Sequence, residues 1–477
     1  MPRTSGSLPT QFLGHLGELN LVRSTFDPSY NEQHGALVYR LLQKLQGYYE
    51  ETKSKTFRLN MAGTPLVVTK DPKVYKSVLG PFQKHFANSV SFRKAFGYFA
   101  PSSMIVLESK SWNRVRKVAT RALALQSIDH IPSIVCSTVD TWRSIQPENA
   151  LDFHLNPDQE FPKWTFDCFN RLMYNWDSKA TCNNPLSLEV VRDCGIISHA
   201  MSKRMMLPYE LLWKLPLPEN QRIDQAKERL MMHTFELVHA RREAVDERQT
   251  TLLDCLLVAS EEARLSTDEV YDQVFTFFFA AFDTISHTLS LLLNHLAADP
   301  TVQEELRQAI LQTFPNGKSD IAKATLDDLN KCDYLTWVVN EIFRLTPTTT
   351  GVSRTCIKSC VINGYQFDVG DQFLFDGVGV GRTREYFQNQ PDLDAFRPRR
   401  FAQLGSIDKT LSMPFGMGSR ICPGRKLAVG QLKAFCAYII LSYDLTRPAL
   451  LPLLYDMTIG ITIKHGYDKM IWRVRDN

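Results

Sequence analysis

The residue whose type and surroundings best support chemistry is Cys422, in the stretch PFGMGSRICPGRKLA over residues 414–428. The segment 424–445 is predicted to be helical, so the sulfur would lie at a helix N-terminus, where unpaired backbone N–H groups and the helix dipole stabilise a thiolate. Three glycines permit tight backbone turns and the close approach of a flat ligand. They are Gly416, Gly418 and Gly424.

Two neighbours of Cys422 add to this interpretation, and two simpler interpretations compete with it. Arg420 supplies a cation suited to a carboxylate, and Phe415 can pack beside the sulfur and keep water away. A single cysteine is more often a buried small hydrophobe, which is our expectation for the other nine. A glycine-rich turn before a helix can also cradle phosphate, but this one lacks a leading hydrophobic strand and a GKS/T ending.

The longest apolar stretch, residues 274–294, is interrupted at its middle by polar side chains that begin at Asp283 and Thr284. A helix over 267–299 would measure roughly 50 Å. Because it is apolar nearly all round and polar at its centre, we predict that it runs through the interior of a large protein rather than through a membrane.

The remaining elements predict an α+β fold. Helices are expected over 35–50 and 71–79 and through most of 111–340. Strands are expected over 56–61, 65–69, 360–362, 365–369 and 372–375. A small β region thus draws on early and late segments beside a large helical mass, without βαβ alternation. The absence of a Gly/Ser linker favours one continuous globule.

Composition excludes several classes of protein. The chain has 477 residues, and 55 Lys+Arg against 51 Asp+Glu give a net charge of +4, which is too even to indicate a nucleic-acid partner. Its 10 cysteines are scattered without a CxxC pair, so neither a zinc ribbon nor a disulfide framework is expected, and a reduced compartment fits best. Residues 1–10 are polar, and residues 11–20 are too short and mixed to span a bilayer. Either the protein is soluble or an anchor lies outside this sequence.

The pattern Phe415-x-x-Gly418-x-Arg420-x-Cys422-x-Gly424 resembles the haem-binding signature of the cytochrome P-450 superfamily, in its eukaryotic form. The resemblance implies that Cys422 is the thiolate axial ligand to the iron of haem b, which pushes electron density toward the metal and favours O–O cleavage. It also implies the fold of that family, with haem between the long central helix and the cysteine-loop helix. We then expect an N-terminal segment over 1–34 and a catalytic domain over 35–477.

The centre of the long helix, AAFDT over residues 280–284, resembles the (A/G)-G-x-(D/E)-T segment of the same family. The resemblance makes Asp283 and Thr284 the catalytic pair that delivers protons to dioxygen in a dry site. Ala281 replaces the usual glycine and would reshape the local groove. The simpler interpretation is that Asp283 is a buried polar group and that the Thr284 hydroxyl bonds to an earlier carbonyl.

A second match is Glu341-x-x-Arg344, which resembles the family's E-x-x-R and places both side chains on one helical face. Residues 396–401, FRPRRF, resemble its F-x-P-E-R-F, with Arg399 in place of glutamate. The resemblance joins Arg400 to Glu341 and Arg344 in a structural triad, which serves folding and haem retention and takes no part in bond making.

A third match, Trp112-x-x-x-Arg116, resembles the family's W-x-x-x-R. It implies that Trp112, Arg116 and Arg420 surround the haem propionates, with Arg354 as a further candidate, because the guanidinium fork suits a carboxylate. A solvated helix face is the simpler interpretation of the Trp/Arg pair.

The Asp-Thr pair favours a monooxygenase that inserts one atom of O2 into a C–H bond. No flavin or nicotinamide fingerprint is present, so electrons would come from an NADPH-dependent reductase or a ferredoxin. A basic patch is expected to receive this partner. Its members are Arg114, Lys117, Arg121, Arg425, Lys426 and Lys433. Two alternatives stay open: a haem-thiolate isomerase or dehydratase without a redox partner, and a haem-binding sensor without turnover.

Substrate identity is weakly encoded, and a lipophilic sterol, fatty acid or terpenoid is expected. The main pocket candidates are Phe96, Phe99, Phe277, Ala280, Ala281 and Thr288, with further apolar candidates at Phe92, Tyr98, Met205, Met206, Leu207, Leu211, Leu212 and Trp213. Each of these taken alone is more often ordinary core packing. The expected location is the cytosolic face of the endoplasmic reticulum membrane if an anchor exists, and mitochondrial or cytoplasmic otherwise.

Overall fold

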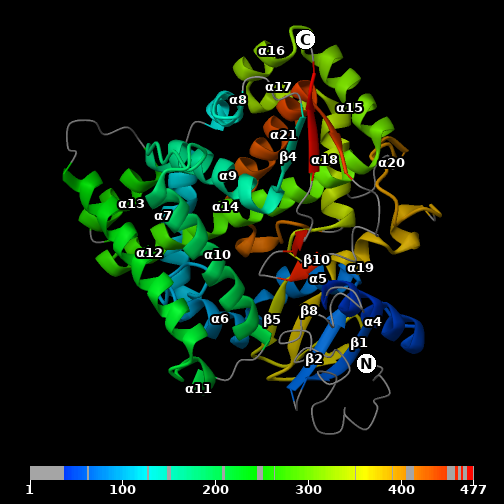
Figure 1. Ribbon diagram of the computed structural model, residues 1–477. Helices are drawn as coiled ribbons and strands as arrows, with labels where there is room; N and C mark the ends of the chain where they lie inside the picture. The colour runs from blue at the N-terminus through cyan, green and yellow to red at the C-terminus, as the bar shows by residue number, and fades with distance from the viewer. Residues whose placement is uncertain are drawn as a thin grey trace. The chain divides into compact units, whose positions relative to one another are not determined.

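The computed structural model describes residues 37–61, 64–125, 128–147, 152–206, 210–243, 251–262, 264–349, 351–388, 390–403, 413–447, 457–459, 463–465 and 470–475 (Figure 1). The expectation for residues 1–34 lies outside this part of the chain. The described residues group into two compact units, and each is treated by itself. The first unit falls within residues 1–92, 340–422 and 450–466, and the second within 93–339, 423–449 and 467–477.

The first unit is built around a five-stranded sheet that joins early and late segments. Its order is β1 (Thr56–Met61), β2 (Thr64–Thr69), β8 (Gln372–Phe375), β5 (Ser353–Cys356) and β3 (Phe86–Asn88). The β2–β8 pair is parallel, and the other neighbours are antiparallel. Figure 1 shows the blue strands beside the yellow ones. The predicted strands over 56–61 and 372–375 are confirmed, whereas the short strands β3 and β5 were not predicted.

Helix α5 (Pro72–Leu79) packs on this sheet, as its sequence signals predict. The Asp71 side chain accepts a hydrogen bond from the Lys73 backbone N–H at 2.9 Å, and Pro72 occupies the first turn, where its missing N–H costs nothing. Tyr75 of the helix stacks on Phe375 of β8, with ring centroids 3.9 Å apart. This contact lies in the main apolar core of the first unit.

The other elements of the first unit are short. Strands β6 (Cys360–Ile362) and β7 (Tyr365–Phe367) form a hairpin whose turn, Asn363-Gly364, has both φ angles positive, as a tight hairpin requires. The rest are α4 (Leu37–Thr52), η1 (Gln83–His85), α19 (Gly377–Gly381), η4 (Arg384–Phe387), α20 (Arg400–Gln403), η5 (Gly418–Arg420), and the β10 (Met457–Ile459) and β11 (Ile463–His465) hairpin.

The second unit holds most of the helices and a small sheet. Its helices are α7 (Ser109–Leu125), α8 (Ile131–Ser144) after η2 (Ile128–His130), α9 (Pro157–Tyr174), α10 (Pro185–Met206), α11 (Glu210–Trp213), α12 (Pro218–Glu243), α13 (Leu252–Glu261), α14 (Thr267–Ala298), α15 (Pro300–Thr313), α16 (Lys318–Lys323), α17 (Leu326–Asn330) and α21 (Arg425–Ser442). Helices α6 (Val90–Gly97) and α18 (Asp333–Leu345) each contain a unit boundary. The sheet has the order β4 (Asp152–Leu155), β12 (Met470–Val474) and β9 (Tyr443–Thr446).

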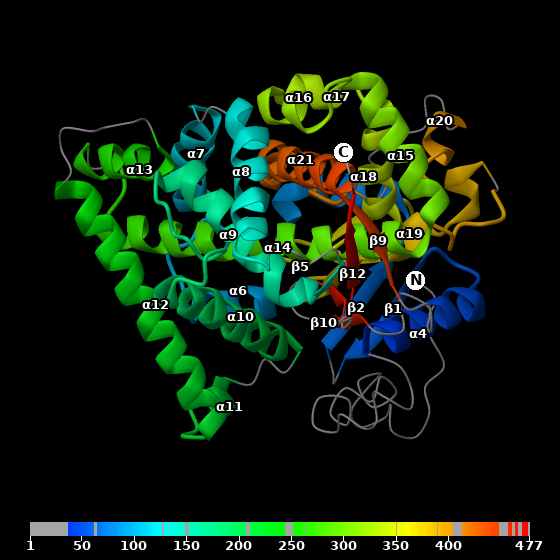
Figure 2. The same cartoon turned by 45° about the horizontal axis from the view of Figure 1, so that its top comes forward.

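Helix α14 is the centre of the second unit. It begins at a reciprocal capping box between Ser266 and Glu269. Helices α9, α10, α12 and α21 all contact it, and Figure 2 shows it as the long green ribbon among them. Among the described residues it is the one helix long and apolar enough to cross a membrane, but 83% of its most apolar window is buried inside the protein. The prediction of an interior helix is confirmed.

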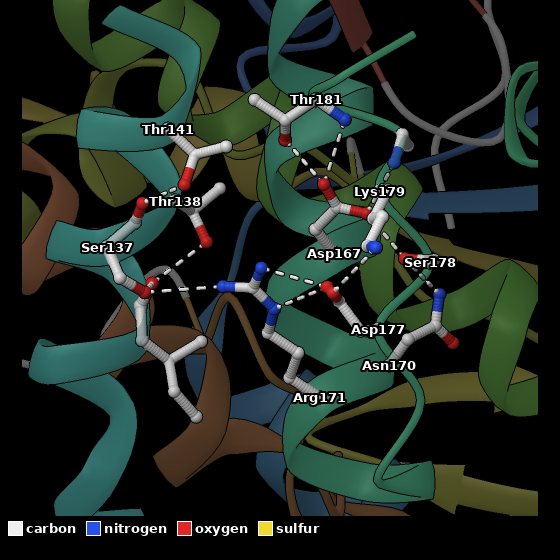
Figure 3. A network of polar contacts seen from close by, with 12 residues as sticks. Ser137, Thr138, Thr141, Asp167, Asn170, Arg171, Asp177, Ser178, Lys179 and Thr181 are labelled. Atoms are coloured by element: carbon white, nitrogen blue, oxygen red, sulfur yellow. Dashed lines mark hydrogen bonds and ion pairs between the residues drawn. The ribbon is translucent and has the colours of Figure 1, made fainter. Parts of the chain in front are cut away.

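The loop between α9 and α10 is fixed by a buried carboxylate (Figure 3). Asp167 of α9 accepts hydrogen bonds from the backbone N–H groups of Ala180 and Thr181, both at 2.8 Å, and from the hydroxyls of Ser178 and Thr181. A buried carboxylate is stable only when its oxygens are satisfied in this way. The network therefore holds the start of α10 against α9.

The α+β class is confirmed, with two departures. Residues 152–155 form strand β4 inside a segment predicted as mostly helical, because this short extended stretch completes a sheet with the distant strand β12. Helix α21 ends at Ser442, and the predicted last residues of that helix form β9 instead. Both differences reflect long-range strand pairing, which local sequence patterns do not reveal.

Candidate functional site

The loop that carries Cys422 is held close to the end of α5. Gly418 has φ +69, and a Cβ at this position would lie 2.3 Å from the carbonyl oxygen of Leu79. The backbone N–H of Cys422 donates to the carbonyl oxygen of Phe415 at 2.9 Å, which closes the loop. The cysteine itself is exposed. Glycine is therefore required at 418, and the loop presents a reachable thiol.

The neighbours of Cys422 are placed as follows. The Phe415 ring lies edge-on to Phe343, with centroids 5.2 Å apart, and Arg420 is partly exposed at the end of η5. Gly424 differs from the expectation for a turn glycine, because its φ of −85 is open to any residue. A Cβ there would meet nothing within 4 Å, so the space beside it still permits a close approach by a flat group.

The three residues of the structural triad do meet. The guanidinium of Arg344 binds both carboxylate oxygens of Glu341, with Nε–Oε2 at 2.7 Å and Nη2–Oε1 at 2.8 Å. Nε of Arg400 binds Oε1 of the same carboxylate at 2.9 Å. All three side chains are buried. One buried carboxylate thus binds two guanidinium groups. The arrangement is stable only when both arginines and the glutamate are present.

The remaining donors of the triad tie down the loop after α19. Arg344 donates to the carbonyl oxygens of Gly381 at 2.7 Å and Leu393 at 2.8 Å. Arg400 donates to the carbonyl oxygen of Asp392 at 3.0 Å. Glu341 also accepts from the backbone N–H of Arg397 at 2.8 Å. The triad is thus a buried hub for the chain that leads toward the Cys422 loop.

At the centre of α14, Asp283 and Thr284 have different surroundings. The Asp283 carboxylate is 4% exposed, and its Oδ2 accepts a hydrogen bond from Ser198 of α10 at 3.2 Å. Nδ1 of His287, one turn along α14, lies 3.7 Å from the same oxygen. Thr284 donates to the carbonyl oxygen of Ala280 at 2.9 Å, as the simpler interpretation expects.

One face of α14 is partly exposed near its middle. From residue 273 to 297 every residue is buried except Ala280, Ala281 and Thr284, which are partly exposed. These positions lie one turn apart on one face. Phe277 and Thr288 continue that face on either side and are buried, and Thr288 donates to the carbonyl oxygen of Thr284 at 2.7 Å. The middle of this face, with small side chains, is thus the accessible part of residues 273–297.

The residues expected around the propionates fall into both units. Trp112 is buried and Arg116 is partly exposed, one turn apart on α7 of the second unit. Arg354 is partly exposed on β5 of the first unit, where its Nη1 donates to the carbonyl oxygen of Ser353 at 2.8 Å. Arg420 also belongs to the first unit.

The expected basic patch loses one member and keeps five exposed ones. Lys433 is 3% exposed, and its Nζ donates to the side-chain oxygens of Asn330 and Thr336, both at 2.7 Å. Its assignment to the surface was wrong, because its position on α21 faces α17 and α18. The exposed members are Arg114, Lys117, Arg121, Arg425 and Lys426. Among them Arg114 forms a bidentate ion pair with Glu269.

The main aromatic pocket candidates lie in the interior. Phe96 and Phe99 are both buried, and Phe96 packs edge-on to Phe279 of α14 with centroids 5.7 Å apart.

All ten cysteines lie among the described residues and are free, which confirms that no disulfide framework exists. Cys182 is exposed, so the expectation of a buried thiol was wrong there.

Sequence reasoning missed Ser198 and His287 as partners of Asp283. Ser198 lies on another helix, and nothing in its local sequence marks the contact. His287 carried a readable signal, because a histidine four residues after an aspartate shares its helical face.

Comparisons with known proteins agree with the motifs. A family model described as Cytochrome P450 matches residues 33–464. Over 171 residues the chain is 38% identical to "Cytochrome P450 3A14" of Cavia porcellus, which covers 35% of this chain and 33% of that protein. The chain thus spans about a third of the length of this relative.

Longer matches are more distant. The chain is 24% identical over 423 residues to "Lithocholate 6-beta-hydroxylase" of Mesocricetus auratus, which covers 85% of this chain and 80% of that protein. It is 24% identical over 449 residues to "Cytochrome P450 4d1" of Drosophila simulans, which covers 86% and 82%.

Proposed function

Since the chain belongs to the cytochrome P450 family, we propose that it is a haem-thiolate monooxygenase that inserts one oxygen atom of O2 into a C–H bond of a lipophilic substrate. The family match extends across both units and supports a catalytic domain over 35–477 preceded by a segment over 1–34. The substrate is a sterol, fatty acid or terpenoid. The observation that carries the proposal is the exposed thiol of Cys422 on its anchored loop.

Membership of this family implies haem b bound through a cysteine thiolate, and the residues present fit that group. The Cys422 sulfur is the ligand, and the unfilled space at the Cβ position of Gly424 is compatible with a flat group close to the backbone. Phe415 is assigned to the sulfur side in this proposal. Arg354, Arg420, Trp112 and Arg116 are the propionate contacts. When bound, the haem supplies the site at which dioxygen is reduced.

The partly exposed face of α14 lines the substrate side of the site. Ala280, Ala281 and Thr284 supply its partly exposed floor, and small side chains there leave room for substrate and O2. Phe277 and Thr288 continue this face along the helix, and Phe96 and Phe99 are the further pocket candidates in this proposal. The reaction R–H + O2 + 2 electrons + 2 protons → R–OH + H2O consumes two protons. Thr284 and Asp283 convey them in this proposal, and Thr284 first gives up its bond to the Ala280 carbonyl.

The buried triad of Glu341, Arg344 and Arg400 serves folding and haem retention. Its hydrogen bonds support this role, since the two guanidinium groups donate to backbone carbonyl oxygens within residues 381–395, which precede the cysteine loop in the chain. No bond making is assigned to it.

Electrons come from an NADPH-dependent reductase or a ferredoxin that docks on a basic surface. Lys117, Arg121, Arg425 and Lys426 remain exposed for this contact.

Membrane association at the cytosolic face of the endoplasmic reticulum is supported by exposed leucines around α11. These are Leu211, Leu212, Leu215 and Leu217.

Turnover under ¹⁸O2 tests the proposed function. Purified protein, NADPH and a cytochrome P450 reductase are incubated with sterols, fatty acids and terpenoids, and products are identified by mass spectrometry. We expect a product with one ¹⁸O atom and NADPH consumption that depends on substrate. An isomerised or dehydrated product without NADPH would support the isomerase or dehydratase. A spectral shift on binding with no product under any redox partner would support the sensor.

A further inference from the structure

The buried carboxylate of Asp283 has a polar environment that the family motif does not describe. Its Oδ2 lies 3.2 Å from the Ser198 hydroxyl and 3.7 Å from Nδ1 of His287. All three residues are at least 96% buried, with exposures of 4%, 1% and 2%. A buried carboxylate is costly unless its oxygens accept hydrogen bonds. Ser198 supplies one such donor, and His287 places an imidazole beside the same oxygen.

The direction of the Asp283 side chain gives this environment a function. Consecutive residues on a helix point about 100° apart, so Asp283 and Thr284 face different neighbours. Thr284 belongs to the partly exposed face with Ala280 and Ala281, whereas Asp283 faces α10. The Asp283 carboxylate is therefore held from the side of α10, away from the helix face that carries Thr284.

Polar groups of α10 lie on the buried side of Asp283. The Ser198 hydroxyl donates to Oδ2 of Asp283, and the Ser202 hydroxyl donates to the backbone carbonyl oxygen of Ser198 at 3.0 Å, which is a contact within the helix. Cys194, one turn before Ser198, stays a neutral thiol, because burial and then the negative charges of Asp283 and Asp193 raise its pKa. The network of Asp167 fixes the start of α10 (Figure 3), so Ser198 is held at a defined position.

We propose that Ser198 and His287 are positioning residues that hold the Asp283 carboxylate on the α10 side of α14, so that it serves Thr284 from a fixed place. This inference rests on the proposed monooxygenase function. The Ser198 hydroxyl lies within hydrogen-bond distance of Oδ2, and the His287 imidazole lies beside the same oxygen at 3.7 Å. Loss of either neighbour lets the carboxylate leave this position.

The test compares His287→Gln with His295→Gln, a second buried histidine on the same helix. In His287→Gln we expect product per NADPH to fall about tenfold, with peroxide rising and a larger solvent deuterium isotope effect on kcat. Haem content and the substrate-induced spectral shift should stay at the wild-type level. His295→Gln should leave the coupling ratio and the isotope effect unchanged.

Ser198 gives a second, milder pair of variants that does not depend on the folding of His287→Gln. Ser198→Ala should lower coupling, and Ser198→Thr, which keeps the hydroxyl, should restore it. Unchanged coupling and isotope effect in both His287→Gln and Ser198→Ala, measured in protein whose wild type forms ¹⁸O product, would overturn the inference while leaving the proposed function intact. An inactive wild type would instead count against the proposed function.

Discussion

Burial changes the pKa and the role of a charged residue, and Lys433 shows this most clearly. Its sequence context resembles that of Arg425 and Lys426, yet its ammonium lies between Asn330 and Thr336 in the interior. Burial lowers the pKa of Lys433 to about 8, which the nearby Cys332 and Asp333 only partly oppose. A neutral amine still donates to both oxygens, so the site tolerates deprotonation.

This pKa predicts a pH-dependent contribution to stability. Because the folded pKa lies below the unfolded value of 10.5, the unfolded chain binds more protons between pH 8 and 10.5, and Lys433 favours the folded state increasingly as pH rises through that window. Urea unfolding at pH 7 and 10 should show the free-energy difference between wild type and Lys433→Met growing by about 1–3 kcal/mol. A constant difference would contradict the buried assignment.

The triad predicts a large loss of stability when the charge of Glu341 is removed. Glu341→Gln leaves two buried guanidinium groups without their anion, which should lower the free energy of unfolding by about 3–5 kcal/mol and reduce the haem-loaded fraction. The matched control is Asp394→Asn, which removes a carboxylate that is 84% exposed beside Arg382. That change should cost less than about 1 kcal/mol. Equal losses in the two variants would show that burial does not govern the triad.

At the scale of elements, α14 combines a rigid aromatic base with a partly exposed face. Phe278 contacts Phe166 of α9 and Tyr174 at its end, with centroids 5.9 and 5.1 Å away, and meets His233 of α12 at 5.9 Å. These contacts fix the helix on the side away from Ala280 and Thr284. Packing thus holds the partly exposed face in place.

Phe278→Ala should therefore destabilise the protein by about 3–5 kcal/mol, because a large buried ring leaves a cavity. Its control is Phe235→Ala on α12, where the ring is 52% exposed and the loss should stay below about 1 kcal/mol. Denaturant unfolding of both variants measures the contrast. A Phe278→Ala protein as stable as the control would show that α14 is not anchored by this cluster.

Local patterns in the sequence were sufficient for the elements that carry the site, and insufficient for their partners. The Asp71-Pro72 pair predicted α5 and the long apolar stretch predicted α14, and the E-x-x-R spacing predicted the Glu341–Arg344 pair. Strands β4 and β9 were missed because each depends on pairing with β12. The Ser198–Asp283 contact and the burial of Lys433 were missed for the same reason, since the packing of distant helices decides them.

At the scale of the whole molecule, charge and surface apolarity set the partners. A net charge of +4 leaves the chain nearly neutral, so the proposed docking of a reductase would depend on local groups such as Lys117 and Arg425 rather than on the overall field. The exposed leucines around α11 are a separate apolar surface, in which Leu211 is 75% exposed and Leu212 is 47% exposed. Apolar side chains gathered in this way suit a lipid interface.

A membrane contact at α11 predicts weaker binding to vesicles when charge is introduced there. The double variant Leu211→Asp, Leu212→Asp should weaken binding to phosphatidylcholine–phosphatidylserine vesicles by about a hundredfold or more in co-sedimentation, because each buried leucine contributes about 1.5–3 kcal/mol and about 1.4 kcal/mol is a tenfold change. Leu186→Asp is the control, since this leucine is 49% exposed on α10 outside that surface. Vesicle binding that falls equally in both proteins would argue against a contact at α11.

The ligand of the iron is the claim on which the rest depends, and the carbon monoxide difference spectrum of the reduced protein tests it directly. Wild-type protein and Cys182→Ser, which alters another exposed thiol, should both give the absorption band typical of the haem-thiolate family. Cys422→Ser should lose that band. Retention of the band in Cys422→Ser, or its loss in Cys182→Ser, would contradict the assignment of Cys422.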